Sequence, residues 1–134
     1  MKPVVVPELR YPRLWLAIGL LLAGIITVLS LIPNTELLDL KVSDKIEHLL
    51  AYVALGFCFA SVVVRRDWGW LVLSLLAFGA LIEVAQGMMS LGRSADVRDF
   101  VADAAGIGIG LLLALTPLGR WARWLESLVF RVRA

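Results

Sequence analysis

The chain has 134 residues, of which 60% are hydrophobic and only 18% charged, and its mean hydropathy is +0.88. A soluble domain of this length could not bury so much apolar surface, so the composition indicates a single-domain integral membrane protein. The net charge of +2 is not accompanied by a stripe of aromatic and basic residues, which argues against a nucleic-acid-binding protein. The single cysteine, Cys58, excludes an intramolecular disulfide.

Four long uncharged stretches predict four membrane-crossing helices. They cover residues 14–35, 49–64, 68–82 and 104–119. A bilayer core about 30 Å thick needs roughly 20 helical residues, so the first stretch is long enough alone. The other three must draw polar neighbours into the membrane region. The first stretch is too long for a signal peptide and no small-residue cleavage site follows it, so we expect it to be retained.

The expected fold is an all-α, polytopic four-transmembrane-helix bundle followed by a short interfacial amphipathic helix. We expect an irregular cytoplasmic lead over residues 1–12, the transmembrane domain over 13–117, and a basic amphipathic segment over 118–134. The four helices of the domain are expected at about 13–32, 45–64, 68–88 and 95–116. In the last segment, large apolar residues recur at helical spacing, namely Trp121, Trp124, Leu125, Leu128 and Val132.

The charges divide unevenly between the two sides that four crossings define. The side with both ends of the chain and the 65–67 loop carries nine basic residues against three acids. The opposite side carries four basic residues against eight acids. The positive-inside rule therefore places both termini in the cytoplasm and the acid-rich side outside.

A cluster of polar side chains is expected at the outward side. Ionisable groups at membrane depth cost about 2.5–3.5 kcal/mol each on insertion, so a group of them usually marks a site. Helical spacing arranges them in three stripes, which are Lys45–His48–Tyr52, Glu83–Gln86 and Asp96–Asp99–Asp103. The third stripe continues into Gly106 and Gly110, a G-x-x-x-G step that lets a neighbouring helix approach closely.

The residue types in this cluster suit more than one ligand. Lys45, Arg93 and Arg98 can capture a phosphate or carboxylate, with the acids orienting the arginines and His48 acting as acid or base. His48 with Glu83 and the aspartates can hold a divalent cation. However, no compact ligand motif such as H-E-x-x-H is present and the three basic residues would oppose a cation, so we expect no metal.

Two further interpretations stay open for the same residues. A Ser94–His48–Asp triad can be drawn, but no nucleophile elbow surrounds the serine. Ion pairs such as Arg93 with Asp99, or His48 with Glu83, can also serve helix assembly alone, although such contacts contribute only about 0.6 kcal/mol on average.

Taken together, these segments resemble the VanZ-like family. The shared pattern is Lys45-x-x-His48-x-x-x-Tyr52-x-x-Leu55-Gly56, then Glu83-x-x-Gln86, then Gly92-Arg93-Ser94 with Asp96 and Asp99, and finally Gly106 and Gly110. The resemblance covers residues 14–116 and departs from the family at Asp103, where asparagine is common. It implies a small bacterial integral membrane protein, and the founding member is linked to resistance to the glycopeptide antibiotic teicoplanin.

Three hypotheses about function follow. In the first, an inner-membrane protein binds an anionic envelope ligand, either a lipid-linked phosphate or a lipid headgroup. The expected ligand-binding residues are Lys45, His48, Tyr52, Glu83, Gln86, Arg93, Asp96, Asp99 and Asp103. In the second, it is a membrane-embedded enzyme acting on a phosphorylated lipid, with His48, Glu83 and Asp99 as candidate catalytic residues. In the third, the charges serve helix assembly or a partner protein. We expect the lipid bilayer as partner, no nucleic acid and no cofactor, and the sequence leaves the oligomeric state open.

Overall fold

The fold is all-helical, as predicted. The computed structural model describes residues 5–32, 44–89 and 96–129. Its long helices are α1 (Pro12–Leu31), α2 (Asp44–Val62), α3 (Trp68–Met88) and α4 (Val97–Leu115). A short 3₁₀ turn, η1 (Arg65–Asp67), precedes α3. A second 3₁₀ turn, η2 (Pro117–Arg120), leads from α4 into a last helix, α5 (Trp121–Val129). The four long helices and the short C-terminal helix confirm the predicted fold class, and the described residues contain no strand beyond one isolated bridge.

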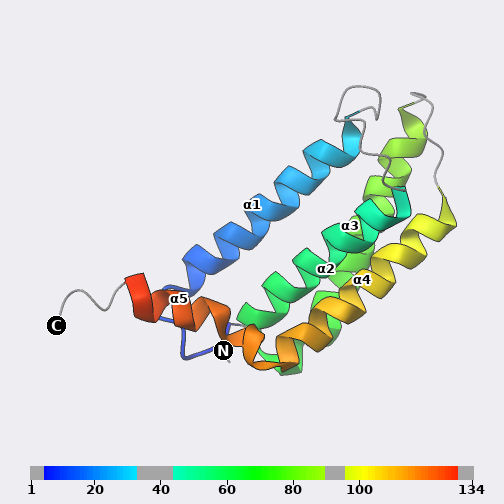
Figure 1. Ribbon diagram of the computed structural model, residues 1–134. Helices are drawn as coiled ribbons and strands as arrows, with labels where there is room; N and C mark the ends of the chain where they lie inside the picture. Colours follow the sequence, from blue (N-terminus) through cyan, green and yellow to red (C-terminus); the bar gives the residue numbers. More distant parts are fainter. Residues whose placement is uncertain (1–4, 33–43, 90–95, 130–134) are drawn as a thin grey trace.

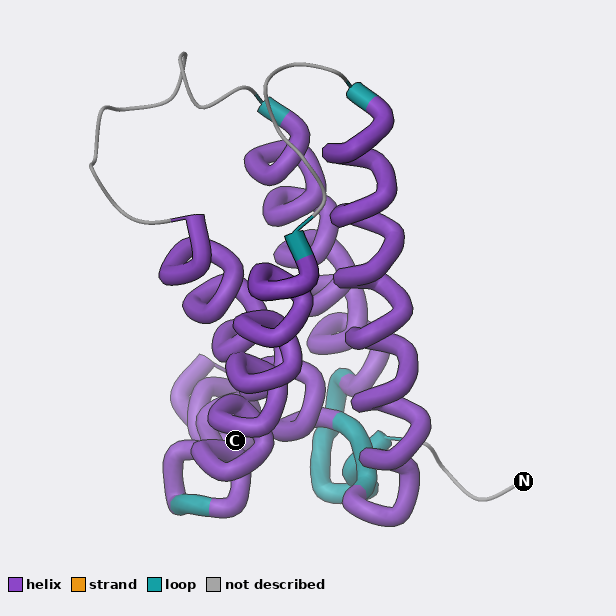
Figure 2. Tube along the Cα trace, turned by 90° about the vertical axis from the view of Figure 1, so that its right-hand side faces the viewer, coloured by secondary structure: helices purple, strands orange, loops and turns teal. Residues whose placement is uncertain are grey.

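The four long helices lie side by side, and α5 turns across one end of them (Figure 1). A view turned by 90° shows the same side-by-side arrangement of the helices (Figure 2). Three segments are long and apolar enough to cross a membrane: α1, α2 and the stretch Arg65–Met88. The fourth candidate combines α4 with the η2–α5 segment, which bends away from it by 77°. What sets α4 apart from these three segments is its charge, because Arg98, Asp99 and Asp103 all lie within it.

The up-and-down order of the helices gives the bundle two unlike ends. The end formed by the start of α1, the end of α2 and the start of α3 holds most of the described arginines, and we call it the basic pole. The opposite end, formed by the start of α2, the end of α3 and the start of α4, holds the carboxylates of these helices, and we call it the acidic pole.

Helices α2 and α4 pack closely because glycines face the contact. A Cβ atom at Gly106 would lie 2.5 Å from the carbonyl oxygen of Leu49, and one at Gly110 would lie 2.5 Å from the backbone nitrogen of Phe57. Both distances are too short for any larger residue without movement of the backbone. The G-x-x-x-G step therefore sets the distance between these two helices, as expected from its spacing.

At the basic pole, the carboxylate of Glu126 in α5 fastens the start of the chain to its end. It accepts hydrogen bonds from the backbone N–H groups of Arg10 (2.8 Å) and Tyr11 (2.9 Å) and from the indole N–H of Trp15 (2.7 Å). Burial alone would raise the pKa of the Glu126 carboxyl, but these three hydrogen bonds outweigh it and hold the pKa below its ordinary value. The carboxylate thus holds the two residues that lead into α1, a helix that has no side-chain cap of its own.

The two tryptophans of α5 have different surroundings. Trp121 packs edge-on against Trp15, with ring centroids 5.1 Å apart, and stacks near Phe57. Trp124 is 62% exposed. The predicted amphipathic helix is present, but only Trp124 projects outward as an interfacial anchor would, because the other ring belongs to the protein's own packing. A cavity of about 460 Å³ also opens at this pole, and its lining includes Arg65, Arg120 and Arg123.

Candidate functional site

The predicted polar stripes converge inside the acidic pole. His48 is in the second turn of α2, Glu83 is five residues before the end of α3, and Asp103 is six residues after the start of α4. At 1.5 Å per residue these positions lie roughly 6–9 Å inside the helix ends. All three side chains are buried, and Asp103 has no exposed surface at all.

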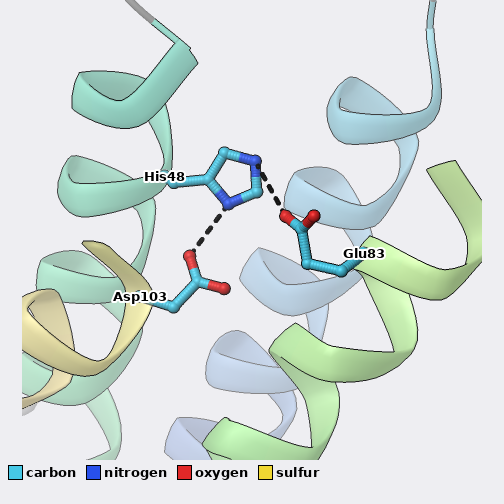
Figure 3. Close-up of side chains that lie close together, drawn as sticks. All are labelled: His48, Glu83 and Asp103. Carbon is cyan, nitrogen blue, oxygen red and sulfur yellow. Dashed lines mark hydrogen bonds and ion pairs between the residues drawn. The ribbon is translucent and has the colours of Figure 1, made fainter. Parts of the chain in front are cut away.

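His48 is held between two carboxylates (Figure 3). Its Nδ1 lies 2.9 Å from Oδ1 of Asp103, a hydrogen-bond distance, and its Nε2 lies 3.6 Å from Oε1 of Glu83. We call His48, Glu83 and Asp103 the histidine–carboxylate centre. One ligand-type atom from each of the three lies within 4.8 Å of the others. The predicted His48–Glu83 contact is therefore present, and Asp103 adds a shorter one.

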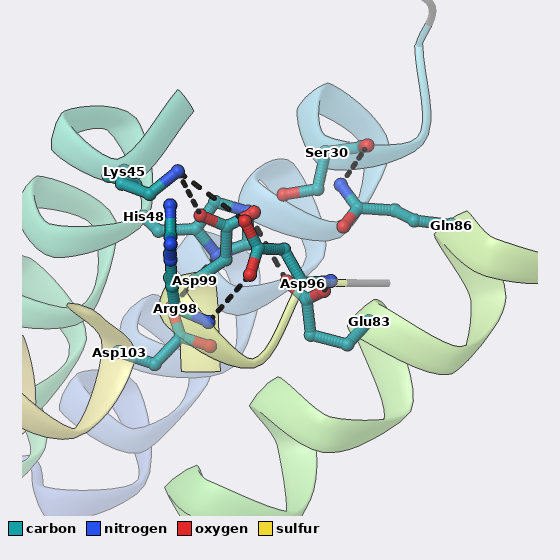
Figure 4. A network of polar contacts seen from close by, with 9 residues as sticks. All are labelled: Ser30, Lys45, His48, Glu83, Gln86, Asp96, Arg98, Asp99 and Asp103. Atoms are coloured by element: carbon teal, nitrogen blue, oxygen red, sulfur yellow. Dashed lines mark hydrogen bonds and ion pairs between the residues drawn. The ribbon is translucent and has the colours of Figure 1, made fainter. Parts of the chain in front are cut away.

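Lys45 bridges the second pair of acids closer to the pole (Figure 4). Its ammonium lies 3.5 Å from Oδ2 of Asp96 and 3.7 Å from Oδ1 of Asp99, and its side chain is 45% exposed. Asp96 is the N-cap of α4 and accepts a hydrogen bond of 2.8 Å from the backbone N–H of Arg98. That hydrogen bond, together with the nearby ammonium, holds the pKa of the Asp96 carboxyl below its usual range.

Glu83 and Gln86 tie α3 to its neighbours. Oε2 of Glu83 accepts a hydrogen bond of 3.1 Å from the backbone N–H of Asp96, so the same carboxylate faces His48 with one oxygen and the start of α4 with the other. Gln86 donates from Nε2 to the carbonyl oxygen of Ser30 in α1, at 2.8 Å. Gln86 therefore anchors α1 to the bundle, and this described contact gives it a structural role.

Tyr52 and Gly79 border the histidine–carboxylate centre beside Asp103. A Cβ atom at Gly79 would lie 2.6 Å from Oδ2 of Asp103 and 3.0 Å from the hydroxyl of Tyr52, so only glycine leaves room for both groups on that side of α3. Among the described residues, neither this Asp103 oxygen nor the Tyr52 hydroxyl has a hydrogen-bond partner, although both are buried. Oε1 of Glu83 and Oδ1 of Asp99 are in the same situation.

Sequence reasoning and the structure agree on most members of the cluster. The structure brings together seven of the predicted residues around α2, α3 and α4, namely Lys45, His48, Tyr52, Glu83, Asp96, Asp99 and Asp103. Arg93 and Ser94 lie outside the described residues, so their predicted roles stay predictions. Arg98 is exposed at the start of α4 and contributes its backbone N–H to Asp96.

Two participants were missed by sequence reasoning. Ser30 takes part through its carbonyl oxygen, for which a side-chain pattern carries no signal. Gly79 lies four residues before Glu83 on α3, and this i, i−4 spacing to a buried carboxylate was a signal that could have found it.

The chain was also compared with known proteins. A family model described as VanZ/LLP1 matches residues 9–120, which include every described residue of the site. Neither curated proteins nor solved structures gave a match. The family match covers most of the chain and agrees with the multi-pass helical fold, so this membrane protein belongs to the VanZ/LLP1 family.

Proposed function

We propose that this protein resides in the bacterial cytoplasmic membrane with both termini in the cytoplasm, and that its outward-facing acidic pole binds an anionic envelope ligand. The ligand is a lipid-linked phosphate or the headgroup of an anionic lipid. The orientation is supported by the nine basic residues against three acids on the side of the chain's ends. Binding of an envelope precursor at this pole would alter the cell's tolerance of glycopeptide antibiotics.

The observation that carries the proposal is the position of Lys45. Its ammonium lies at the long end of the ion-pair range from Asp96 and Asp99, and nearly half of its side chain is exposed. An ammonium group has three donors, so Lys45 can meet an incoming phosphate while it stays near its acids. The buried His48 lies one turn below Lys45 on the same face of α2, where it can exchange a proton with a bound group.

The proposal is tested by binding of phosphatidic acid, as a phosphate-bearing lipid probe, to the purified protein in nanodiscs. Lys45→Ala should weaken binding about tenfold or more, because one charge-assisted contact is worth roughly 1.5–3 kcal/mol. The matched control is Arg13→Ala, which removes one exposed positive charge at the basic pole. Equal affinity in both variants would remove Lys45 from the binding site.

Arg93 is tested in the same assay. If its guanidinium recognises phosphate by paired hydrogen bonds, Arg93→Lys should weaken binding nearly as much as Arg93→Ala, because lysine keeps the charge but loses the planar fork. If Arg93 only balances the acids, Arg93→Lys should bind normally and Arg93→Ala should mainly lower the amount of folded protein.

A second candidate function is an enzyme acting on a phosphorylated lipid, and the His48–Asp103 hydrogen bond of 2.9 Å favours it. A carboxylate on one ring nitrogen fixes the tautomer and orientation of an imidazole that acts as acid or base with the other. Release of inorganic phosphate from the lipid probe, abolished by His48→Ala, would establish this activity. Binding without phosphate release would leave the first function. The absence of both binding and phosphate release would favour a role in helix assembly.

A further inference from the structure

The histidine–carboxylate centre is short of positive charge. Glu83 and Asp103 are buried, and so is the neighbouring Asp99. Among the described basic side chains, His48 lies within ion-pair distance of Glu83 and Asp103, and Lys45 lies within ion-pair distance of Asp99. A buried carboxylate without a compensating partner is strongly unfavourable, so such groups are paired or coordinate metals.

The centre also holds acceptors that no described donor uses. Oε1 of Glu83 and Oδ2 of Asp103 are buried and accept no hydrogen bond within the described part of the chain. Glu83 is 7% exposed, and Figure 3 shows its carboxylate pointing at the ring of His48. These oxygens are therefore free to act as ligands without breaking an existing hydrogen bond.

The distances around His48 suit a metal ion on one side of the ring. The 3.6 Å between Nε2 of His48 and Oε1 of Glu83 is close to the separation of two ligands bound to one ion at about 2.1 Å with a near-tetrahedral angle. The 2.9 Å contact on the other side is at hydrogen-bond distance, and because an ionised carboxylate can only accept, Nδ1–H is the donor to Asp103 when that group is charged. A carboxylate in that position orients a metal-binding imidazole and raises its basicity.

We propose that the centre binds a divalent cation through Nε2 of His48 and the Glu83 carboxylate, with Asp103 orienting the imidazole and adding negative charge. One imidazole and carboxylate oxygens suit Mn²⁺ or Zn²⁺. The remaining coordination positions are filled by water or by an oxygen of an anionic ligand. The cation needs only residues of this chain, so the proposal goes beyond the proposed lipid-binding function and does not depend on it.

Lys45 and Arg98, the two described basic residues that argued against a metal, do not lie in this centre. Lys45 lies against Asp96 and Asp99, closer to the pole, and Arg98 is exposed. A cation at His48 would give the site the positive charge that a phosphate requires, deeper than Lys45 can reach.

The test measures Mn²⁺ binding to the purified protein, stripped with EDTA and held in nanodiscs, by loss of the free Mn²⁺ signal in electron paramagnetic resonance. We expect one Mn²⁺ per chain, displaced by Zn²⁺. Glu83→Gln keeps the shape of the side chain but removes the ligand charge, and should weaken binding at least tenfold. Asp103→Asn keeps an acceptor for His48 and should weaken binding by about 10–100-fold, the range for residues that support a metal ligand.

The control is Glu47→Gln, which removes an exposed carboxylate next to His48 and should leave affinity unchanged. Size-exclusion profiles and circular dichroism check that each variant is folded. No stoichiometric binding of Mn²⁺ or Zn²⁺ to the folded wild type would overturn the proposal, as would equal affinity in wild type and folded Glu83→Gln. Because phosphatidic acid binding is measured separately on Lys45→Ala, the failure of one proposal is distinguishable from the failure of the other.

Discussion

Replacing Gly106 by alanine should separate α2 from α4 and disturb the centre one turn away. A Cβ atom at this position would lie 2.5 Å from the Leu49 carbonyl oxygen, whereas ordinary contacts begin at 3.4 Å, so α4 would have to retreat by the difference of about 0.9 Å. Overpacking of this kind costs ~1–3 kcal/mol. The obstacle is backbone, which cannot swing aside as a flexible side chain would.

The retreat should reach His48 through Asp103. Asp103 lies three residues before Gly106 on the same face of α4, and its Oδ1 is 2.9 Å from Nδ1 of His48. A displacement comparable to 0.9 Å would carry this pair beyond the ~3.2 Å limit of a good hydrogen bond. The variant should therefore lose both stability and the fixed orientation of the imidazole.

The chain is well suited to the assay because His48 is its single histidine. One pair of imidazole ¹⁵N resonances reports the hydrogen bond, and unfolding in detergent micelles reports stability. The matched control is Gly108→Ala, where a Cβ atom would meet nothing within 4 Å. Both variants gain about 1 kcal/mol of helix propensity, so their difference isolates the overpacking. Equal stability and unchanged imidazole resonances in the two variants would refute the reasoning.

Three other predictions concern orientation and the basic pole. In a background without the native cysteine, Cys introduced at Asp39 should react with an impermeant reagent from outside and Cys at Asp67 should not; the reverse pattern would invert the topology. Trp124 as the sole tryptophan should show blue-shifted emission and be quenched by brominated lipid, whereas Trp121, half-buried against Trp15, should be quenched less; water-like emission from Trp124 would contradict an interfacial α5. Glu126→Gln should lower the free energy of unfolding by about 1.5–3 kcal/mol. Because the pKa of Glu126 is lowered on folding, its contribution to the free energy of unfolding is complete above the ordinary value of 4.5 and is lost as the pH falls below it. The free energies of unfolding of wild type and variant should therefore converge in acid. A difference that stays constant with pH would show that the Glu126 charge is not its cause.

Much of the fold follows from the sequence because membrane helices are specified by local features. The hydropathy stretches and the turn residues between them predict helices within two residues of most observed ends; α3 ends at Met88 as expected, and α2 ends at Val62 rather than at 64. The fold at the basic pole was less predictable. The Glu126 carboxylate meets Arg10 across more than a hundred residues, and no periodic pattern reports a contact of that range.

The site was predictable only as far as helical stripes allow. Spacing shows that Lys45 and His48 share a face of α2, but it does not give the rotation of that face relative to α3 and α4. The structure supplies that rotation, and with it the separate partners of the two residues: Lys45 faces Asp96 and Asp99, while His48 faces the deeper acids. The single basic-and-acidic cluster read from the sequence is therefore two layers with different charge balance.

The deeper layer, which consists of His48, Glu83 and Asp103, contains the one position at which the chain departs from the family pattern it resembles. An asparagine at position 103 would offer His48 the same acceptor oxygen that Asp103 offers, so orienting the imidazole does not require a negative charge. The carboxylate nevertheless lies fully buried, with one oxygen accepting no hydrogen bond from the described residues. Burying that charge is costly unless a cation compensates for it. A protonated His48 would satisfy one carboxylate, but the centre contains two, and a divalent cation would neutralise both while leaving positions open to a phosphate.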